Sequence, residues 1–278
     1  MIVSSAAFSG MGAFAKAAAD VPVVEKVVAS NLILLVIAGA AARRAGRPLL
    51  GRRENQGLLL LRSFLGVAGA VCYFYAIDHL ILADATMLTR LAPFFVAVFA
   101  LFFLSERPPK AVIFAMVIAF AGGLLVIKPR FALSILPALI GLATSVFAGG
   151  AQTTLRSLRS RETPETIVFH FSLATVVVLT PFAALDFHLP TGRETLLLIG
   201  IGVGAAIGQF GLTLAYRYAP AAGVSIYSHT MIIFSAVFGL AFWAEVPDPL
   251  SLVGGVLIIS GGALAFAAER PRRSELGV

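Results

Sequence analysis

Cysteine and charged residues are both scarce in this chain of 278 residues. Cys72 is the only cysteine, so no disulfide can form within the chain and no cluster of thiolates can hold a metal. Charged residues make up only 13% of the sequence against 59% hydrophobic residues, which leaves too little polar surface to cover a water-soluble core. The excess of apolar residues predicts a protein whose outer surface faces lipid.

Enzymatic motifs are missing as well. The sequence has no Gly-x-Ser-x-Gly, no His-Glu-x-x-His, no phosphate-binding glycine loop and no pair of acidic residues deep in an apolar run. We therefore expect no enzyme, no cofactor and no metal. The formal net charge is +7, but the arginines and lysines cluster between apolar runs, as in loops that face the cytoplasm, so we expect no nucleic-acid partner.

Ten apolar runs of about the length that crosses a bilayer follow one another along the chain. They are continuous rather than alternating, which favours helices over the strands of a barrel. The runs cover residues 2–19, 26–42, 57–77, 83–104, 111–128, 132–154, 165–185, 194–216, 222–243 and 250–268. The sequence therefore predicts an all-α polytopic membrane protein with ten transmembrane helices. Pro93 lies inside the fourth run and predicts a kink there.

Positive charge predicts the orientation in the membrane. With the N-terminus inside, the connections on the inner side carry fourteen Lys and Arg residues and those on the outer side carry five. The remaining two, Arg62 and Arg90, lie within apolar runs. This asymmetry predicts that both termini are cytoplasmic, which requires an even number of spans.

An internal repeat is the most informative feature. A shift of 139 residues places FVAVFALFFLSERP (95–108) on FSAVFGLAFWAEVP (234–247), and Gly122–Gly123 on Gly261–Gly262. The halves, residues 1–130 and 131–278, would each hold five helices. An odd number inverts the second half relative to the first, as in secondary transporters whose substrate site lies at mid-membrane between the repeats. A duplicated structural bundle without transport is the alternative.

The run LRSFLGVAGAVCYFYAIDHLILADATMLTRLAPFFVAVFALFFLSERP (61–108) resembles the ten-helix EamA branch of the drug/metabolite transporter superfamily. The resemblance covers essentially the whole chain, although Ser-Glu-Arg-Pro replaces the usual Gly-Glu-Arg. It implies a transporter fold without naming the substrate, since members carry amino acids, nucleotide-like metabolites, sugars and other compounds. Among members, the chain looks most like a YddG-type bacterial amino-acid exporter.

Arg90 is the sharpest candidate for a substrate-binding residue, because a charge inside an apolar run is costly and usually faces the interior. Its guanidinium could hold a carboxylate of the substrate. The alternatives are a structural pair with Asp84, Asp78 or a backbone carbonyl, or a head group that reaches the interface. His229 is its repeat equivalent and could face the same cavity, or pack as a hydrogen-bonded histidine.

The resemblance implies that further polar residues line the cavity, because they fall on the runs that do so in related folds. Thr86 shares a helix face with Arg90, and Ser225 shares one with His229. The other candidate substrate-binding residues are Tyr73, Gln152, Gln209, Thr213, Tyr216 and Tyr227. A second repeat-related pair, Asn31 and His170, favours contacts between helices over ligand binding.

These observations predict a bacterial inner-membrane transporter, a monomer or a loose dimer, working by alternating access. The expected cargo is an amino acid or similar small zwitterion, and the expected direction is export. The alternatives are another small metabolite, such as an organic anion or a nucleotide-like compound, and a non-transporting scaffold. No carboxylate lies deep in a run, so proton coupling would fall to His170 or His229, or transport would run by facilitation or exchange.

Overall fold

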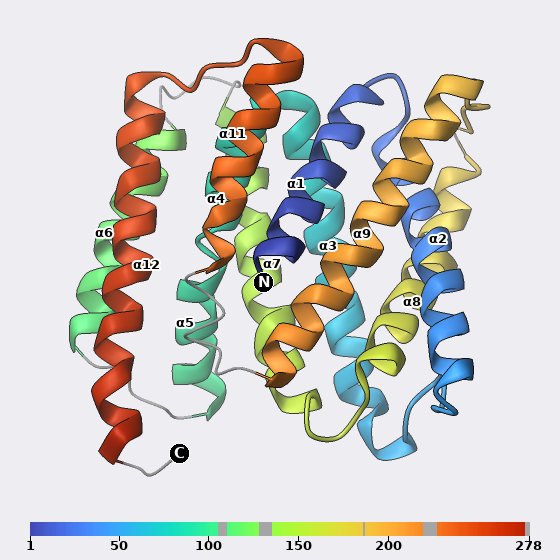
Figure 1. The fold of residues 1–278 in the computed structure, drawn as a ribbon, viewed down its shortest axis with the longest axis horizontal. Coiled ribbons are helices and arrows are strands. Elements are labelled where there is room, and N and C mark those ends of the chain that lie inside the picture. The colour runs from blue at the N-terminus through green and yellow to red at the C-terminus, as the bar shows by residue number, and fades with distance from the viewer. Residues whose placement is uncertain (105–109, 128–134, 186, 219–226, 276–278) are drawn as a thin grey trace.

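The computed structural model describes residues 1–104, 110–127, 135–185, 187–218 and 227–275, with the side chains of 100–104, 216 and 269–275 outside the description. The described residues form a bundle of helices without strands (Figure 1). The helices are α1 (Ile2–Ala17), α2 (Val23–Arg44), α3 (Gln56–His79), α4 (Leu82–Thr89), α5 (Ala92–Leu104), α6 (Lys110–Ile127), α7 (Leu136–Leu158), α8 (Pro164–Ala183), α9 (Gly192–Tyr218), α11 (Thr230–Trp243) and α12 (Pro249–Glu275), with a short 3₁₀ turn, η1, at Arg53–Asn55.

Every predicted run contains a helix. Eight helical segments among the described residues are long and apolar enough to cross a membrane, counting Leu82–Phe99 as one span. The helices α1 and α11 are shorter, with 16 and 14 residues. The prediction of an all-helical polytopic membrane protein is confirmed, including the second run, where Asn31 does not interrupt α2.

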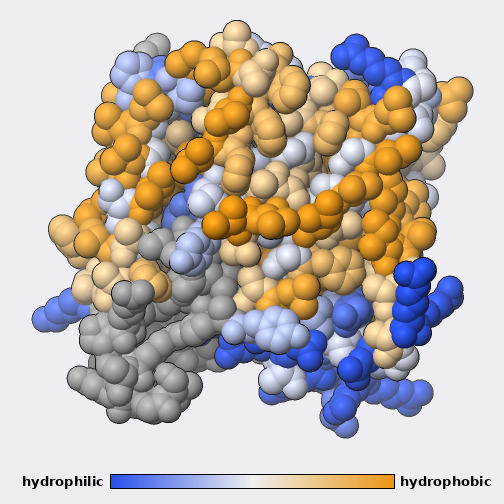
Figure 2. Space-filling view, viewed as in Figure 1, coloured by the Kyte–Doolittle hydropathy of each residue, from blue (hydrophilic) through white to orange (hydrophobic). Residues whose placement is uncertain are grey.

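The outer surface of the bundle is apolar, as lipid contact requires. Val36, Phe64 and Phe242 are 71%, 67% and 69% exposed. Hydrophobic side chains cover most of the middle of the face in Figure 2, and strongly hydrophilic residues gather at its upper and lower margins.

The two ends of the bundle differ in their charged residues. The lysine end, uppermost in Figure 1, carries Lys16, Lys26, Asp78 and Glu245. The arginine end, lowermost there, carries the α2–α3 connection with Arg43, Arg44, Arg47, Arg52 and Arg53, and the α7–α8 connection with Arg159 and Arg161. The predicted orientation depends on this difference, because it places the arginine-rich connections in the cytoplasm.

Packing between the two halves is symmetric. The pairs α1 with α9 and α3 with α7 are related to each other by the 139-residue shift, and the pairs α2 with α8 and α6 with α12 map onto themselves. The helix α1 ends at the lysine end, whereas its repeat equivalent α7 ends at the arginine end (Figure 1). The halves are therefore inverted relative to each other, although the boundary between 130 and 131 stays a prediction.

Glycines allow α6 and α12 to touch through their backbones. A Cβ added at Gly122 would lie 2.5 Å from the carbonyl oxygen of Gly254, and one at Gly254 would lie 2.6 Å from that of Gly122. The same close approach recurs at the repeat-related position of this helix pair, where a Cβ at Gly261 of α12 would lie 2.7 Å from the carbonyl oxygen of Ala115 in α6. Small residues let helices approach closely in lipid, where no hydrophobic force holds them together.

We expect Gly122→Ala to destabilise the protein, because its methyl group would overlap a backbone atom that cannot move alone. Overpacking of this kind costs about 1–3 kcal/mol of unfolding free energy. Gly57→Ala is the matched control, since no atom lies within 4 Å of its added Cβ. Thermal unfolding in detergent, followed by the fluorescence of the single tryptophan, compares the two; equal midpoints would contradict the packing of α6 on α12.

Candidate substrate cavity

A cavity of about 190 Å³ lies inside the bundle, between the two halves. Its walls come from α1, α2, α3, α7, α8, α9 and α11, together with the junction of α4 and α5. Phe8, Phe74, Phe171 and several leucines and methionines make most of the lining apolar. The polar lining residues are Ser30, Asn31, Arg62, Tyr73, Thr89, Arg90, Thr144, Gln152 and Gln209.

A break in the fourth span brings Arg90 to this cavity. Pro93 has no N–H and its ring would clash with the carbonyl of Thr89, so a continuous helix is disfavoured at this point. The segment α4 ends at Thr89 and α5 begins at Ala92, with Arg90 and Leu91 between them. Phe94 N donates to Leu91 O at 3.0 Å, which tightens the junction. The predicted kink at Pro93 is therefore a full interruption of the helix.

The second half breaks at the same position of the repeat. Residues 227–228 are helical, His229 is a turn residue, and α11 begins at Thr230. Here Ile232 replaces proline, so the break does not depend on proline alone. Discontinuous helices of this kind expose backbone polar groups at the centre of transporters, where the exposed groups line a cavity.

The two breaks contact each other through Arg90. Its Nη1 donates to the carbonyl oxygen of Ser228 at 3.2 Å, and its Nε and Nη2 donate to Thr89 Oγ1 at 3.1 and 2.9 Å. Arg90 therefore does bond a backbone carbonyl, which was one of the structural alternatives to substrate binding. Arg90 nevertheless also lines the cavity.

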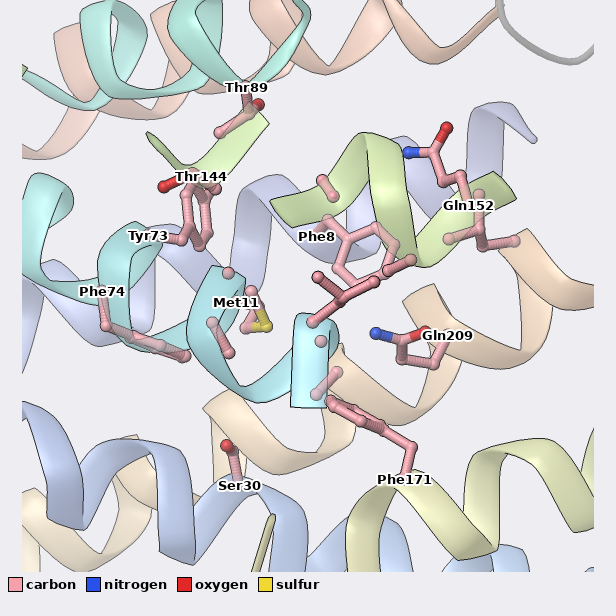
Figure 3. A pocket seen from close by; sticks show the side chains of 18 of the residues that line it. Phe8, Met11, Ser30, Tyr73, Phe74, Thr89, Thr144, Gln152, Phe171 and Gln209 are labelled. Atoms are coloured by element: carbon pink, nitrogen blue, oxygen red, sulfur yellow. The ribbon is translucent and has the colours of Figure 1, made fainter. Parts of the chain in front are cut away.

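Four predicted substrate-binding residues line the cavity: Arg90, Tyr73, Gln152 and Gln209. In Figure 3, Tyr73 from α3, Gln152 from α7 and Gln209 from α9 surround the same space.

Four others are not among the lining residues. Thr86 is fully buried and donates to Leu82 O, where it also bonds Ser235 of α11. Thr213 donates to Gln209 O at 2.8 Å. His229 packs its ring against Gly262 in α12, and Tyr227 is 52% exposed. A hydroxyl that bonds the carbonyl four residues earlier is satisfied within its own helix, which the sequence pattern alone does not reveal. Ser225 and the side chain of Tyr216 lie outside the described residues.

Unsatisfied polar atoms gather on the cavity wall. Asn31 Oδ1, Arg62 Nε and Gln209 Oε1 are buried and have no hydrogen-bond partner within the described part of the chain. Buried polar groups are normally paired, so such atoms indicate a place where a polar ligand or water completes the bonding. The companion of Asn31 in the repeat, His170, instead bonds Ser63 Oγ at 3.0 Å and joins α8 to α3, as predicted for a contact between helices.

Sequence reasoning passed over Arg62, Ser30, Thr89 and Thr144 as lining residues. Arg62 carried the same signal as Arg90, a charge inside an apolar run, and could have been found by it. The small hydroxyl residues carry no signal that separates a cavity wall from a contact between helices.

Two ion pairs lie at the lysine end of the bundle. Lys26, fully buried, donates to both carboxylate oxygens of Asp78 at 2.7 and 2.8 Å. Lys16 pairs with Glu245, whose other oxygen accepts the backbone N–H of Leu82 at 3.1 Å. The Lys26–Asp78 pair joins α2 to α3 within the first half. Lys16 and Glu245 join α1 and α4 to the connection after α11, so of the two pairs only this one holds elements of both halves together.

Inverted halves, interrupted helices facing each other and a cavity with polar groups between the halves define a secondary transporter. The chain belongs to the EamA-like transporter family, which it matches over residues 1–128 and again over 135–267. The two matches correspond to the two copies of the repeat.

Named transporters are among the similar proteins. The chain is 39% identical over 261 residues to the pseudopaline exporter CntI of Pseudomonas aeruginosa, covering 93% of this chain and 91% of the relative. It is 26% identical over 214 residues to a riboflavin transporter of Vibrio cholerae, covering 75% and 70%. A solved crystal structure superposes with a TM-score of 0.71 at 20% identity, over 97% of this chain and 96% of the other, and shows the same fold.

We expect Lys26→Met to destabilise the protein strongly, because the partly buried carboxylate of Asp78 would lose the fully buried lysine with which it pairs. Breaking a buried pair on one side costs about 3–5 kcal/mol of unfolding free energy. The double variant Lys26→Met with Asp78→Asn should recover much of the lost thermal stability. Lys110→Met, at an exposed lysine, is the control; a Lys26 variant as stable as this control would contradict the role of the pair.

Proposed function

We propose that this transporter exports an amino acid or a similar small zwitterionic metabolite across the bacterial inner membrane by alternating access. The observation that carries the proposal is Arg90, a permanently charged guanidinium placed by a helix break on the wall of the cavity between the halves. In the proposed complex, its donors bind the substrate carboxylate while the glutamines and Tyr73 bind the remaining polar groups.

Cavity size and lining support a small cargo. The volume of about 190 Å³ is below the roughly 300–1,000 Å³ of sites for drug-sized ligands. Apolar walls with a few placed polar groups are typical of sites that recognise one small molecule.

Orientation follows from the charge asymmetry in this proposal. The arginine end would face the cytoplasm, with both termini on that side, because short cytoplasmic connections are rich in arginine. The ion pairs of the lysine end would then close the outer side in the conformation described, so that cargo enters from the cytoplasm. We expect the unit of transport to be a single chain, as a monomer or in a loose dimer.

Another small metabolite is the second candidate, and two observations favour it. Two of the similar proteins are named as transporters of pseudopaline and of riboflavin, and neither name is that of an amino acid. The cavity also has a second lining arginine, Arg62, which suits an organic anion or a nucleotide-like compound. The YddG-type assignment stays a prediction.

A ligand screen on the purified protein separates these candidates. Amino acids, organic anions, nucleotides, riboflavin and pseudopaline are compared by the rise in thermal midpoint, since a ligand that binds only the folded protein stabilises it. Counterflow in proteoliposomes with labelled compounds then distinguishes carriage from binding. Stabilisation and counterflow by amino acids support the proposal. It would be overturned if the protein transported only compounds that lack a carboxylate.

We expect Arg90→Gln to weaken binding of carboxylate substrates by about ten- to a hundredfold, because a charge-assisted hydrogen bond contributes about 1.5–3 kcal/mol. Arg90→Lys should retain part of the affinity. Arg44→Gln, at an exposed arginine, is the control. Dissociation constants and counterflow rates are measured on variants whose unliganded thermal midpoints match the wild type; an unchanged constant for Arg90→Gln would remove this residue from the site.

A further inference from the structure

We infer that Arg62 is a second anion-binding residue, so that the cargo carries two separated carboxylates, one held by Arg90 and one by Arg62. This inference rests on the proposed function, because it assigns the second charge to the same substrate. It moves the preferred cargo from a simple zwitterion towards a dicarboxylate.

The guanidinium of Arg62 is buried without a charged partner among the described residues. Arg62 lies in α3 and is only 6% exposed, yet its side chain makes no ion pair or hydrogen bond with any described residue, and its Nε is an unsatisfied buried donor. It packs on the ring of Phe171, whose centroid lies 4.8 Å from the guanidinium carbon. Arg62 and Phe171 both line the cavity.

Burial of this charge carries a free-energy cost that an anion in the cavity would offset. An arginine does not give up its proton in proteins, so it cannot escape the penalty by becoming neutral. A cation–aromatic contact supplies about 0.5–2 kcal/mol, less than the several kcal/mol that removing an ion from water costs. A carboxylate in the cavity would bond the donors that the protein leaves unsatisfied.

Neighbouring residues hold the Arg62 side chain in a fixed place. A Cβ at Gly66, one turn along α3, would collide with Arg62 Nη1 and would lie 2.7 Å from the ring of Phe171. The missing side chain at Gly66 therefore leaves the space into which the guanidinium fits. A donor group positioned before the ligand arrives loses little entropy on binding.

The residues that Arg90 and Arg62 contact lie on different sides of the cavity. In Figure 3, Thr89, which accepts hydrogen bonds from Arg90, lies across the cavity from Phe171, on which Arg62 packs. No aspartate or glutamate is among the described residues that line the cavity. A ligand with one carboxylate, bound by Arg90, would therefore leave the charge of Arg62 without a carboxylate among the described lining residues.

The test uses α,ω-dicarboxylates from succinate to sebacate, each against its own monomethyl ester, which keeps the length but removes one charge. We expect the wild type to bind at least one diacid about tenfold or more tighter than its ester, the equivalent of one charged hydrogen bond. Arg62→Gln should lose this preference and keep its affinity for the ester. Arg90→Gln should lose affinity for both, and Arg44→Gln should behave as the wild type.

Two outcomes would overturn the inference: no diacid preferred over its ester by the wild type, or a preference that survives in Arg62→Gln. Loss of all binding in Arg90→Gln with the preference intact in Arg62→Gln would sink this inference alone and leave the proposed function standing. If Arg62→Gln fails to fold, Gly66→Ala is the second variant. It keeps the charge but displaces the guanidinium, so it should reduce the preference, and an unchanged preference would again contradict the assignment.

Discussion

The interruption of the fourth helix in each half is the constraint on which the rest of the structure depends. Lipid offers no hydrogen bonds, so backbone groups at mid-membrane must be paired or must line a cavity inside the protein. The break at Arg90 and its repeat equivalent at His229 meet through the hydrogen bond from Arg90 to Ser228 O. Charged and unsatisfied groups thereby face the interior, and the helices around them present apolar side chains to lipid.

Symmetry explains how such a centre can open to either side. Because the halves are inverted copies, a helix packing that forms at the lysine end has a repeat-related equivalent that could form at the arginine end. At the lysine end of the described conformation, Lys16–Glu245 holds the two halves together, whereas Lys26–Asp78 joins two helices of the first half. A conformation open at this end would have to break the Lys16–Glu245 pair, while the glycine contacts of α6 with α12 could persist as the axis of motion.

Much of the fold was predictable because the membrane imposes a length and a polarity on each segment. The ten runs, the inverted repeat and the interruption near Pro93 follow from apolar length, the 139-residue shift and the missing proline N–H. Which polar side chain faces the cavity depends, by contrast, on contacts between helices that are far apart in the sequence. Thr86 and Arg90 share a helix face by spacing, yet the hydroxyl of Thr86 is used between α4, α1 and α11 through Ser235.

The site was predictable only in part for the same reason. Arg90, Tyr73, Gln152 and Gln209 were identified from polarity on the right helices, and the structure places them on the cavity wall. Arg62 is also a charged residue within an apolar run, but the sequence does not distinguish it as a binding residue. The structure does so through its burial and the position of its guanidinium over Gly66.

The central claim is that this cavity opens to each side of the membrane in turn. Its most direct test is the accessibility of Gln152→Cys to a membrane-impermeant maleimide, in a Cys72→Ser background, with reagent added from one side or the other during turnover. The account predicts labelling from both sides and protection by bound substrate, while a cysteine at the lipid-facing Val36 is labelled from neither. Labelling of the Gln152 position from a single side throughout transport, or from none, would contradict it.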